Sequence, residues 1–116
     1  FNYYKKKINL LNSFEILDSP SYSISNYWIV LLKVKNKKIS KNHIFKKFFE
    51  KRIQVRPVWY PNHLQKKMTK FQRYKLKNYK NFFKNIICLP SGYNLNTKAL
   101  DRVVRVLHQL DKNEKS

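Results

Sequence analysis

A short segment with two prolines constrains this chain more than any other feature. Residues 56–65 read Arg-Pro-Val-Trp-Tyr-Pro-Asn-His-Leu-Gln. Each proline fixes its own φ angle, lacks a backbone N–H and favours extended geometry in the residue before it. The segment therefore fits neither a helix interior nor a central strand. We expect a stiff loop in which Arg56 and Tyr60 are extended and the side chains between them point in fixed directions.

The size of the chain is that of one small domain. It has 116 residues and a single glycine, Gly92. Loops that cradle a phosphate group usually need glycines, because their backbone adopts positive φ angles or approaches the ligand closely. The sequence has no such loop. The chain begins at Phe1 within a segment of helical character, so we expect it to be one domain of a longer protein.

The sequence predicts neither a disulfide framework nor a membrane span. Cys88 is the single cysteine, so no intrachain disulfide can form. Its apolar neighbours predict a buried side chain. The longest purely apolar run, residues 28–32, is much shorter than the roughly 20 residues that a membrane-spanning helix needs. No signal-peptide pattern is seen, and a reducing cytoplasm is the expected compartment.

The net charge of +20 has two interpretations. A nucleic-acid-binding protein attracts phosphate groups with dense positive charge, and its aromatic rings stack on bases. Alternatively, lysine fills solvent-facing positions without a dedicated role. The pattern favours the second interpretation, because only five of the 26 basic residues are arginines and the lysines are spread along the chain. Base recognition relies mainly on arginine.

Hydrophobic periodicity predicts alternating helices and strands. Helices are expected over residues 1–12, 41–52, 74–84 and 97–110. Strands are expected over residues 14–17, 27–34, 53–55 and 86–89. The order α-β-β-α-β-α-β-α predicts an α/β fold, or a small α+β domain, in which helices pack on a small sheet. The domain would span residues 1–110, and residues 111–116 would form a polar, fraying tail.

Several side chains are assigned to N-caps and to the core. Ser40 is the expected N-cap of the second helix, and Asn96 or Thr97 that of the last. The strand at 27–34 is almost continuously apolar, which predicts burial of both its faces. The helical residues predicted to face the core are Ile44, Phe45, Phe48, Phe49, Leu76, Tyr79, Phe82, Phe83, Leu100, Val103, Val104, Leu107 and Leu110.

In this order the motifs resemble a known family. The aromatic run at 26–28 precedes the Arg-Pro-x-Trp-Tyr-Pro-x-His-x-Gln loop, and a Cys-Leu-Pro-Ser-Gly strand end and a leucine-rich helix follow. From about Tyr4 to Leu110 the chain resembles the C-terminal part of the DegT/DnrJ-type sugar-nucleotide aminotransferases. These are pyridoxal-phosphate (PLP) enzymes of the aspartate-aminotransferase fold. The resemblance implies the C-terminal small domain of a fold-type-I transferase, whose large domain lies upstream.

The resemblance also implies a reaction. A family member transfers an amino group, usually from glutamate, to a keto-sugar carried on a nucleotide diphosphate, for amino-sugar and cell-surface polysaccharide synthesis. PLP is the electron sink. Its Schiff-base lysine lies in the large domain, so no catalytic residue is assigned here and the fragment alone is expected to be inactive. A homodimer is implied. Relatives that lack this lysine and catalyse dehydration are an alternative.

Five residues of the stiff loop are predicted to bind substrate: Arg56, Trp59, Tyr60, His63 and Gln65. Arg56 could donate paired hydrogen bonds to a carboxylate or pyrophosphate. Trp59 and Tyr60 offer flat faces for a sugar or base. His63 and Gln65 could hydrogen-bond sugar hydroxyls or phosphate oxygens. Purely structural roles stand beside these, because Trp59 could seal the core and Arg56 could pair with a neighbouring carboxylate.

Other features limit or qualify this interpretation. A metal site is not expected, because His43 and His108 lie on predicted helices without partner ligands. Family members often have proline after the loop glutamine, where this chain has Lys66 and then Lys67. A small basic nucleic-acid-binding domain remains the alternative function.

Overall fold

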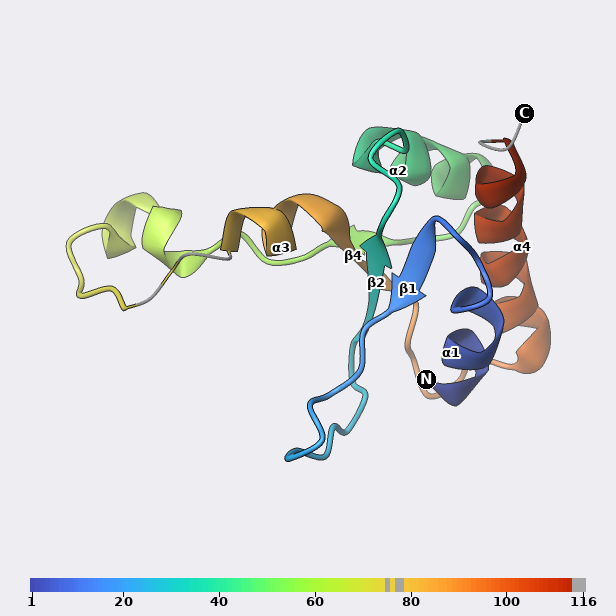
Figure 1. Cartoon of the computed structure of the whole chain (residues 1–116), viewed down its shortest axis with the longest axis horizontal. Coiled ribbons are helices and arrows are strands. Elements are labelled where there is room, and N and C mark those ends of the chain that lie inside the picture. Colours follow the sequence, from blue (N-terminus) through green and yellow to red (C-terminus); the bar gives the residue numbers. More distant parts are fainter. Residues whose placement is uncertain (75, 77–78, 114–116) are drawn as a thin grey trace.

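A computed structural model describes residues 1–74, 76 and 79–113 of the chain. Its helices and strands follow the predicted order, with two short 3-10 turns added (Figure 1). The helices are α1 (Asn2–Ile8), α2 (Lys41–Glu50), α3 (Tyr79–Asn85) and α4 (Thr97–Asn113). The strands are β1 (Phe14–Ile16), β2 (Val30–Val34), β3 (Arg56–Pro57) and β4 (Ile86–Leu89). The 3-10 turns are η1 (Asn62–Leu64) and η2 (Lys66–Met68).

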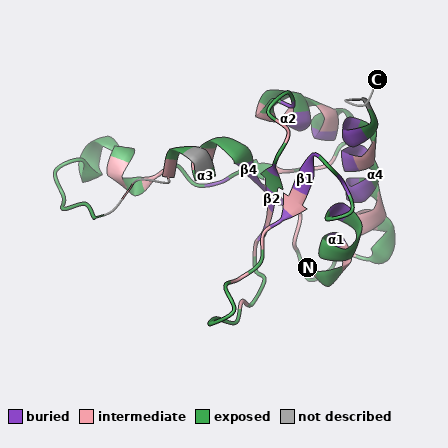
Figure 2. Cartoon of the chain, viewed as in Figure 1, coloured by how far each residue is buried: buried purple, intermediate pink, exposed green. Residues whose placement is uncertain are grey.

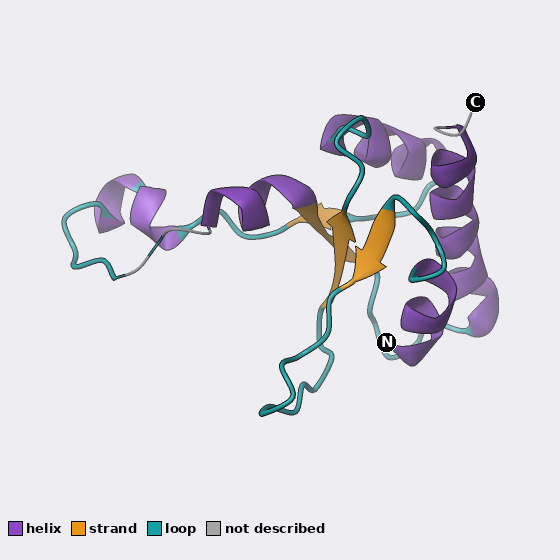
Figure 3. Ribbon diagram, in the orientation of Figure 1, coloured by secondary structure: helices purple, strands orange, loops and turns teal. Residues whose placement is uncertain are grey.

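The four strands form one antiparallel sheet in the order β1-β2-β4-β3. Figure 3 shows this small sheet at the centre of the molecule, beside the helices. In its register Leu31 lies opposite Cys88, and Cys88 lies opposite Arg56. Residues directly opposite each other point to the same face of a sheet. The stiff loop therefore starts from a fixed place on the sheet edge. The predicted α/β class is confirmed.

The core lies on one face of the sheet, under α1, α2 and α4 (Figure 2). Its largest fully buried side chains come from all of these elements: Tyr4, Phe14, Phe48, Ile8, Leu32, Ile44, Ile87, Leu107 and Val30. Burial along β2 alternates, with Leu31 half-buried and Lys33 exposed. The prediction that this strand is covered on both faces is wrong, because its second face is only half-buried at Leu31 and exposed at Lys33.

Two helix caps form as predicted. The Ser40 hydroxyl accepts a hydrogen bond from the His43 backbone N–H at 3.1 Å. The Asn96 side-chain oxygen accepts one from the Ala99 N–H at 2.9 Å. Each cap satisfies a backbone donor that the first turn of a helix leaves free. These two side chains fix where α2 and α4 begin, and Asn96 rather than Thr97 is the cap.

Two residues with left-handed backbone explain errors in the predicted strands. Tyr27 has φ 52° and Arg52 has φ 54°. The first interrupts the predicted strand at 27–34, which starts only at Val30. The second ends α2, and the chain then passes through 53–55 without pairing. The strand predicted at 53–55 is wrong, and pairing starts at Arg56.

The predictions for Phe49, Phe82 and Asp111 also fail. Phe49 is 82% exposed, because α2 turns only Ile44 and Phe48 fully into the core. Phe82 is exposed on α3, which stands away from the core. Asp111 is buried within α4, so the predicted polar tail begins later than expected. Its carboxylate accepts hydrogen bonds from the backbone N–H groups of Asn12, at 3.4 Å, and Ser13, at 2.8 Å.

Residues 60–85 project from the sheet as an arm (Figure 1). The arm leaves the sheet after β3, passes through η1 and η2, and returns through α3 to β4. The helix predicted over 74–84 is shorter than expected: it starts at Tyr79, and Tyr74 and Leu76 are not helical. Residues 75, 77 and 78 lie outside the described part of the chain. None of the described helices is long and apolar enough to cross a membrane.

Candidate functional site

A cleft of about 550 Å³ lies where the stiff loop leaves the sheet. It is lined by side chains from within residues 28–29, 54–59 and 88–95. Three segments far apart in the sequence thus meet here, because β3 and β2 both pair with β4. Among the described residues that line the cleft, Arg56 carries the only charged side chain. A cleft of this size and mixed polarity suits a small organic ligand.

Arg56 brings an available guanidinium group to the cleft. Its backbone is fixed in β3 opposite Cys88, and its side chain is exposed. Within the described part of the chain, no carboxylate pairs with it. The structural alternative, in which Arg56 serves a neighbouring carboxylate, therefore has no support among these residues. A guanidinium group left open to solvent can bind a carboxylate or phosphate with two hydrogen bonds.

Two indole rings stand together at the cleft. Trp59 is 68% exposed and Trp28 is 72% exposed. Their ring centroids are 6.2 Å apart, with planes inclined by 41°. Trp59 therefore does not seal the core. Large aromatic side chains in water forfeit the free energy of burial, so an exposed pair points to a surface used for binding.

Trp28 is held in place by contacts on its backbone. Its carbonyl oxygen accepts a hydrogen bond from the Ser91 hydroxyl at 2.6 Å. Its N–H donates to the side-chain oxygen of Asn26 at 3.1 Å. The residue before it, Tyr27, stacks on Phe1 with centroids 4.0 Å apart and planes at 16°. These contacts fix the direction of the chain as it enters the cleft.

Trp28 and Ser91 were not predicted as site residues. The sequence did contain the relevant signal, since the Asn-Tyr-Trp run and the Leu-Pro-Ser-Gly run are both unusual segments. A Cβ atom at Gly92 would lie 2.9 Å from the side-chain oxygen of Asn94, which also lines the cleft. Only the sheet register shows that these two runs meet.

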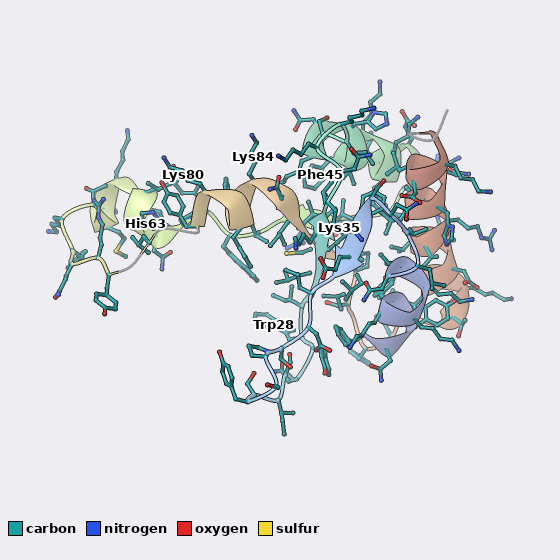
Figure 4. The ribbon with its side chains drawn as sticks, viewed as in Figure 1. Trp28, Lys35, Phe45, His63, Lys80 and Lys84 are labelled. Atoms are coloured by element: carbon teal, nitrogen blue, oxygen red, sulfur yellow. The ribbon has the colours of Figure 1, made fainter. Side chains whose placement is uncertain are left out.

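The remaining loop residues lie in the arm and not in the cleft. The Tyr60 ring meets the Phe83 ring edge-on at 5.8 Å. The Gln65 side-chain amide donates to the Tyr60 carbonyl oxygen at 3.3 Å and to the Asn62 side-chain oxygen at 3.0 Å. Figure 4 shows His63 far out in the arm, well away from Trp28. The structure thus divides the predicted site into two parts.

His63 lies in a second, smaller hollow of about 360 Å³ within the arm. Its ring meets that of Tyr79 edge-on at 4.3 Å. The Nε2 atom is buried and finds no hydrogen-bond partner among the described residues. A buried ring nitrogen without a partner is uncommon in folded proteins. The Nε2 atom of His63 is therefore available for a hydrogen bond in this hollow, which Arg73 also lines.

Cys88 lines the cleft and is half-buried, not fully buried as predicted. Its thiol lies 3.9 Å from the carbonyl oxygen of Pro57. Burial raises the pKa of the Cys88 thiol above its ordinary value, although the nearby Lys41 ammonium group acts in the opposite direction. The protonated thiol is therefore favoured, which makes it a weak nucleophile at neutral pH.

The cleft does not fit covalent attachment of PLP by this chain. Attachment needs a lysine that reaches the cofactor. No lysine is among the described residues that line the cleft, although lysine is the most frequent basic residue of the sequence. We therefore derive no chemical step through PLP from this chain. What its residues can do is bind and orient a ligand.

The sequence matches a known family over almost its whole length. A sequence model of the DegT/DnrJ/EryC1/StrS aminotransferase family matches residues 1–108. The chain belongs to this family. Among curated proteins it is 30% identical over 114 residues to EpsN of Bacillus subtilis (strain 168), whose name provisionally assigns it as a pyridoxal phosphate-dependent aminotransferase. That match covers 95% of this chain and 29% of EpsN.

Two solved structures share the fold of this family member. The aminotransferase TlmJ from Streptoalloteichus hindustanus superposes with a TM-score of 0.81 at 11% identity, covering 99% of this chain and 31% of TlmJ. The sugar aminotransferase CalS13 from Micromonospora echinospora gives a TM-score of 0.77 at 16% identity, covering 93% of this chain and 28% of CalS13. The chain thus spans less than a third of each relative, and the predicted resemblance is confirmed.

Proposed function

We propose that this chain is the C-terminal part of a PLP-dependent aminotransferase that acts on a nucleotide-linked keto-sugar. The amino donor would be an amino acid, with glutamate the first candidate. The reaction would serve amino-sugar and cell-surface polysaccharide synthesis in the cytoplasm, in a homodimer. Family membership over residues 1–108 is the observation that carries this proposal. It also favours an enzyme over a small basic nucleic-acid-binding domain.

The role proposed for this chain is to bind the substrate. Arg56 would pair with the pyrophosphate, since its guanidinium group is open to solvent at the cleft. Trp59 would contact a base or sugar ring. Tyr60, His63 and Gln65 would act from the arm, and the buried Nε2 of His63 supports a polar contact there. PLP would be held by residues outside this chain, because the cleft offers no lysine.

A coupled assay of the entire polypeptide that contains this chain tests the reaction. Purified protein with added PLP is supplied with glutamate and a panel of nucleotide-linked 4-keto-sugars, and 2-oxoglutarate is measured. We expect 2-oxoglutarate to form only when a keto-sugar nucleotide is present. If the keto-sugar is consumed without 2-oxoglutarate, the protein is a dehydratase or another enzyme, and the proposal is wrong.

Substitution of Arg56 tests the binding site separately from the reaction. Arg56→Lys keeps the charge but loses the paired geometry that suits a phosphate group. We expect KM for the nucleotide sugar to rise roughly tenfold, which corresponds to about 1.4 kcal/mol, with little change in the melting temperature. Arg105→Lys, on α4 and outside the cleft, is the matched control and should leave KM unchanged.

The His63→Ala variant tests whether the arm contacts the substrate. If His63 contacts the substrate, KM should rise more than the melting temperature falls, because its ring is not part of the core. Unchanged kinetics combined with a large drop in melting temperature would make His63 a structural residue. The Tyr79→Phe variant keeps the edge-on ring contact of His63 and serves as the control.

A further inference from the structure

We propose that Trp28 and Trp59 together form the surface on which the base of a nucleoside diphosphate stacks, with Arg56 binding its phosphates. The proposal rests on the proposed function for the substrate class and adds to it the part of the substrate that enters this cleft. It also assigns Trp28 a role in substrate binding. Neither ring is needed by the core, because both are mostly exposed.

Both indole rings are largely exposed although they contact each other. Trp28 and Trp59 come from opposite sides of β4, one before β2 and the other after β3, and still meet at 6.2 Å. Packing against each other in this way buries only a minor part of either ring. Aromatic faces left open beside a cleft favour a flat ligand, since base–aromatic stacking is worth about 1–3 kcal/mol per base.

The backbone around both tryptophans is restricted. Trp28 is fixed by the Ser91 hydroxyl on its carbonyl oxygen and by the left-handed Tyr27 before it. Trp59 follows Val58, which is buried, and precedes Tyr60 and Pro61 in the proline-restricted loop. Strained backbone next to a cleft is common at ligand sites, where it holds a side chain in its binding position. Rings fixed in advance lose little entropy when a ligand binds.

The distance and the angle between the two indole rings limit how a base can be placed. A ring sandwiched between two others needs parallel planes separated by roughly 7 Å, twice the contact distance between carbon atoms. The two indoles are 6.2 Å apart and inclined by 41°, so no base fits between them. The base must stack on an outer face of one indole while the other indole covers its edge. Such one-sided stacking tolerates different bases.

The charge at the cleft favours an anionic ligand. Arg56 carries the only charged side chain among the described residues lining the cleft, and it is open to solvent. One guanidinium group beside two indoles matches a flat base linked to phosphates. Polar contacts to the base edge or ribose are available from Gln54 and Asn94, which line the same cleft.

Intrinsic fluorescence tests this directly, because Trp28 and Trp59 are the two tryptophans of the sequence. The chain is titrated with UDP, with thymidine diphosphate and with ADP at physiological salt, which screens unspecific attraction to the high net charge. Pyrophosphate and glucose 1-phosphate are titrated as probes without a base. We expect saturable quenching by the three nucleotides and much weaker quenching by the other two probes.

Variants assign the effect to individual rings. Trp28→Ala and Trp59→Ala should each weaken nucleotide binding roughly 5- to 150-fold, measured by calorimetry. Trp28→Phe should recover part of the affinity, because it keeps a smaller flat face. Tyr93→Ala removes a fully exposed ring beside the cleft residues Gly92 and Asn94 and should leave affinity unchanged. Circular dichroism checks that each variant is folded.

Three results would overturn the proposal. Equal quenching by pyrophosphate and by nucleotides would mean that the cleft binds anions only. Equal quenching by glucose 1-phosphate would mean that the indoles contact the sugar. Absence of saturable quenching by any nucleotide would mean that the pair is not a base-binding surface. None of these binding measurements requires turnover. A negative aminotransferase assay therefore does not decide whether the two indole rings bind a base, and a negative binding result does not decide whether the protein is an aminotransferase.

Discussion

Aromatic side chains are buried in the body of the domain, which is the sheet with α1, α2 and α4, but not in the projecting arm. In the body, Tyr4, Phe14 and Phe48 are fully buried between the sheet and its helices. In the arm, residues 60–85, the described residues include several aromatic side chains, yet none of them is buried. Figure 2 shows this change of burial along the molecule. Whether an aromatic side chain is buried here therefore depends on whether another surface packs against it, and not on the residue type alone.

The arm also changes the dimensions of the molecule. The radius of gyration is 15.5 Å. A compact domain of this length would have a radius of about 13 Å. Within the arm, the outgoing and returning segments meet through edge-on ring pairs, Tyr60 with Phe83 and His63 with Tyr79. These contacts give the arm local order with little buried area, so its stability should be lower than that of the body.

The largest difference in stability between body and arm is expected when one large apolar side chain is truncated in each region. Leu107→Ala in α4 empties space that is fully enclosed, since the leucine is 0% exposed. We expect the free energy of unfolding to fall by about 2–5 kcal/mol in urea titrations followed by circular dichroism. Phe71→Ala in the arm removes a ring that is 57% exposed. This substitution should change the free energy of unfolding by about 0.5 kcal/mol or less.

An equal loss of stability in both variants would contradict this division. It would mean that the arm ring at Phe71 makes contacts as extensive as those of the core leucine. Leu107→Val offers a smaller truncation at the same position and should fall between Leu107→Ala and the unaltered chain.

Limited proteolysis compares local opening in the two regions. Lysine is spread along the whole sequence, so trypsin sites occur in both. Cleavage requires local unfolding, which costs least where few apolar contacts hold the backbone. We expect the first cuts in the arm, after Lys66, Lys67 or Lys70, roughly tenfold faster or more than cuts after Lys46 or Lys47 in α2. Mass spectrometry of the early fragments identifies the order, and first cuts in α2 would refute it.

The sequence predicted the body well where local signals and the core agreed. Ser40 marked the start of α2, and the boundary of β4 at Pro90 matched the structure. The errors occurred where the decisive interaction was not local. Periodicity placed Phe49 inward, but among the described residues that side of α2 stays exposed. It treated Asp111 as tail, although the backbone N–H of Ser13, far away in the sequence, depends on its carboxylate.

The candidate site was predicted only in part for the same reason. The loop at 56–65 was correctly seen as unsuited to a helix interior, but its residues were treated as one surface. The structure sends Arg56 and Trp59 to the cleft and His63 to the arm. Trp28 was missed because its position depends on the register between β2 and β4, which a single sequence does not contain.

Asp111 permits a test of a polar contact in the body. Asp111→Ala leaves the N–H groups of Asn12 and Ser13 without their carboxylate acceptor. Unsatisfied buried donors cost about 1–3 kcal/mol, and we expect a loss of that size in the same urea titrations. Asp111→Asn should recover part of it through its remaining oxygen. Glu50→Gln, which disturbs only the exposed pair with Lys47, is the control and should have little effect.

The Ser40 cap should contribute less. Ser40→Ala removes the hydroxyl that accepts from the His43 N–H and should cost about 1 kcal/mol. Ser40→Asp should retain the cap and add a favourable charge at the start of α2. Ser21→Ala, in the exposed loop between β1 and β2, is the control and should be neutral. Equal stability of Ser40→Ala and the unaltered chain would show that the cap does not stabilise the body.

The smallest expected effect concerns the reactivity of Cys88 at the boundary between core and cleft. Burial raises the pKa of this thiol, so at a given pH the folded chain holds less thiolate than the unfolded chain. Alkylation by iodoacetamide should therefore be several-fold slower in the folded chain, and its rate should rise through a higher pH than in urea. Because the raised pKa favours the protonated thiol, the contribution of Cys88 to the free energy of unfolding is fully present below the ordinary thiol pKa. This contribution declines as the pH rises above that value. If the folded chain reacted as fast as the unfolded one across this range, Cys88 would be open to solvent, and the cleft would extend deeper into the sheet than its lining residues indicate.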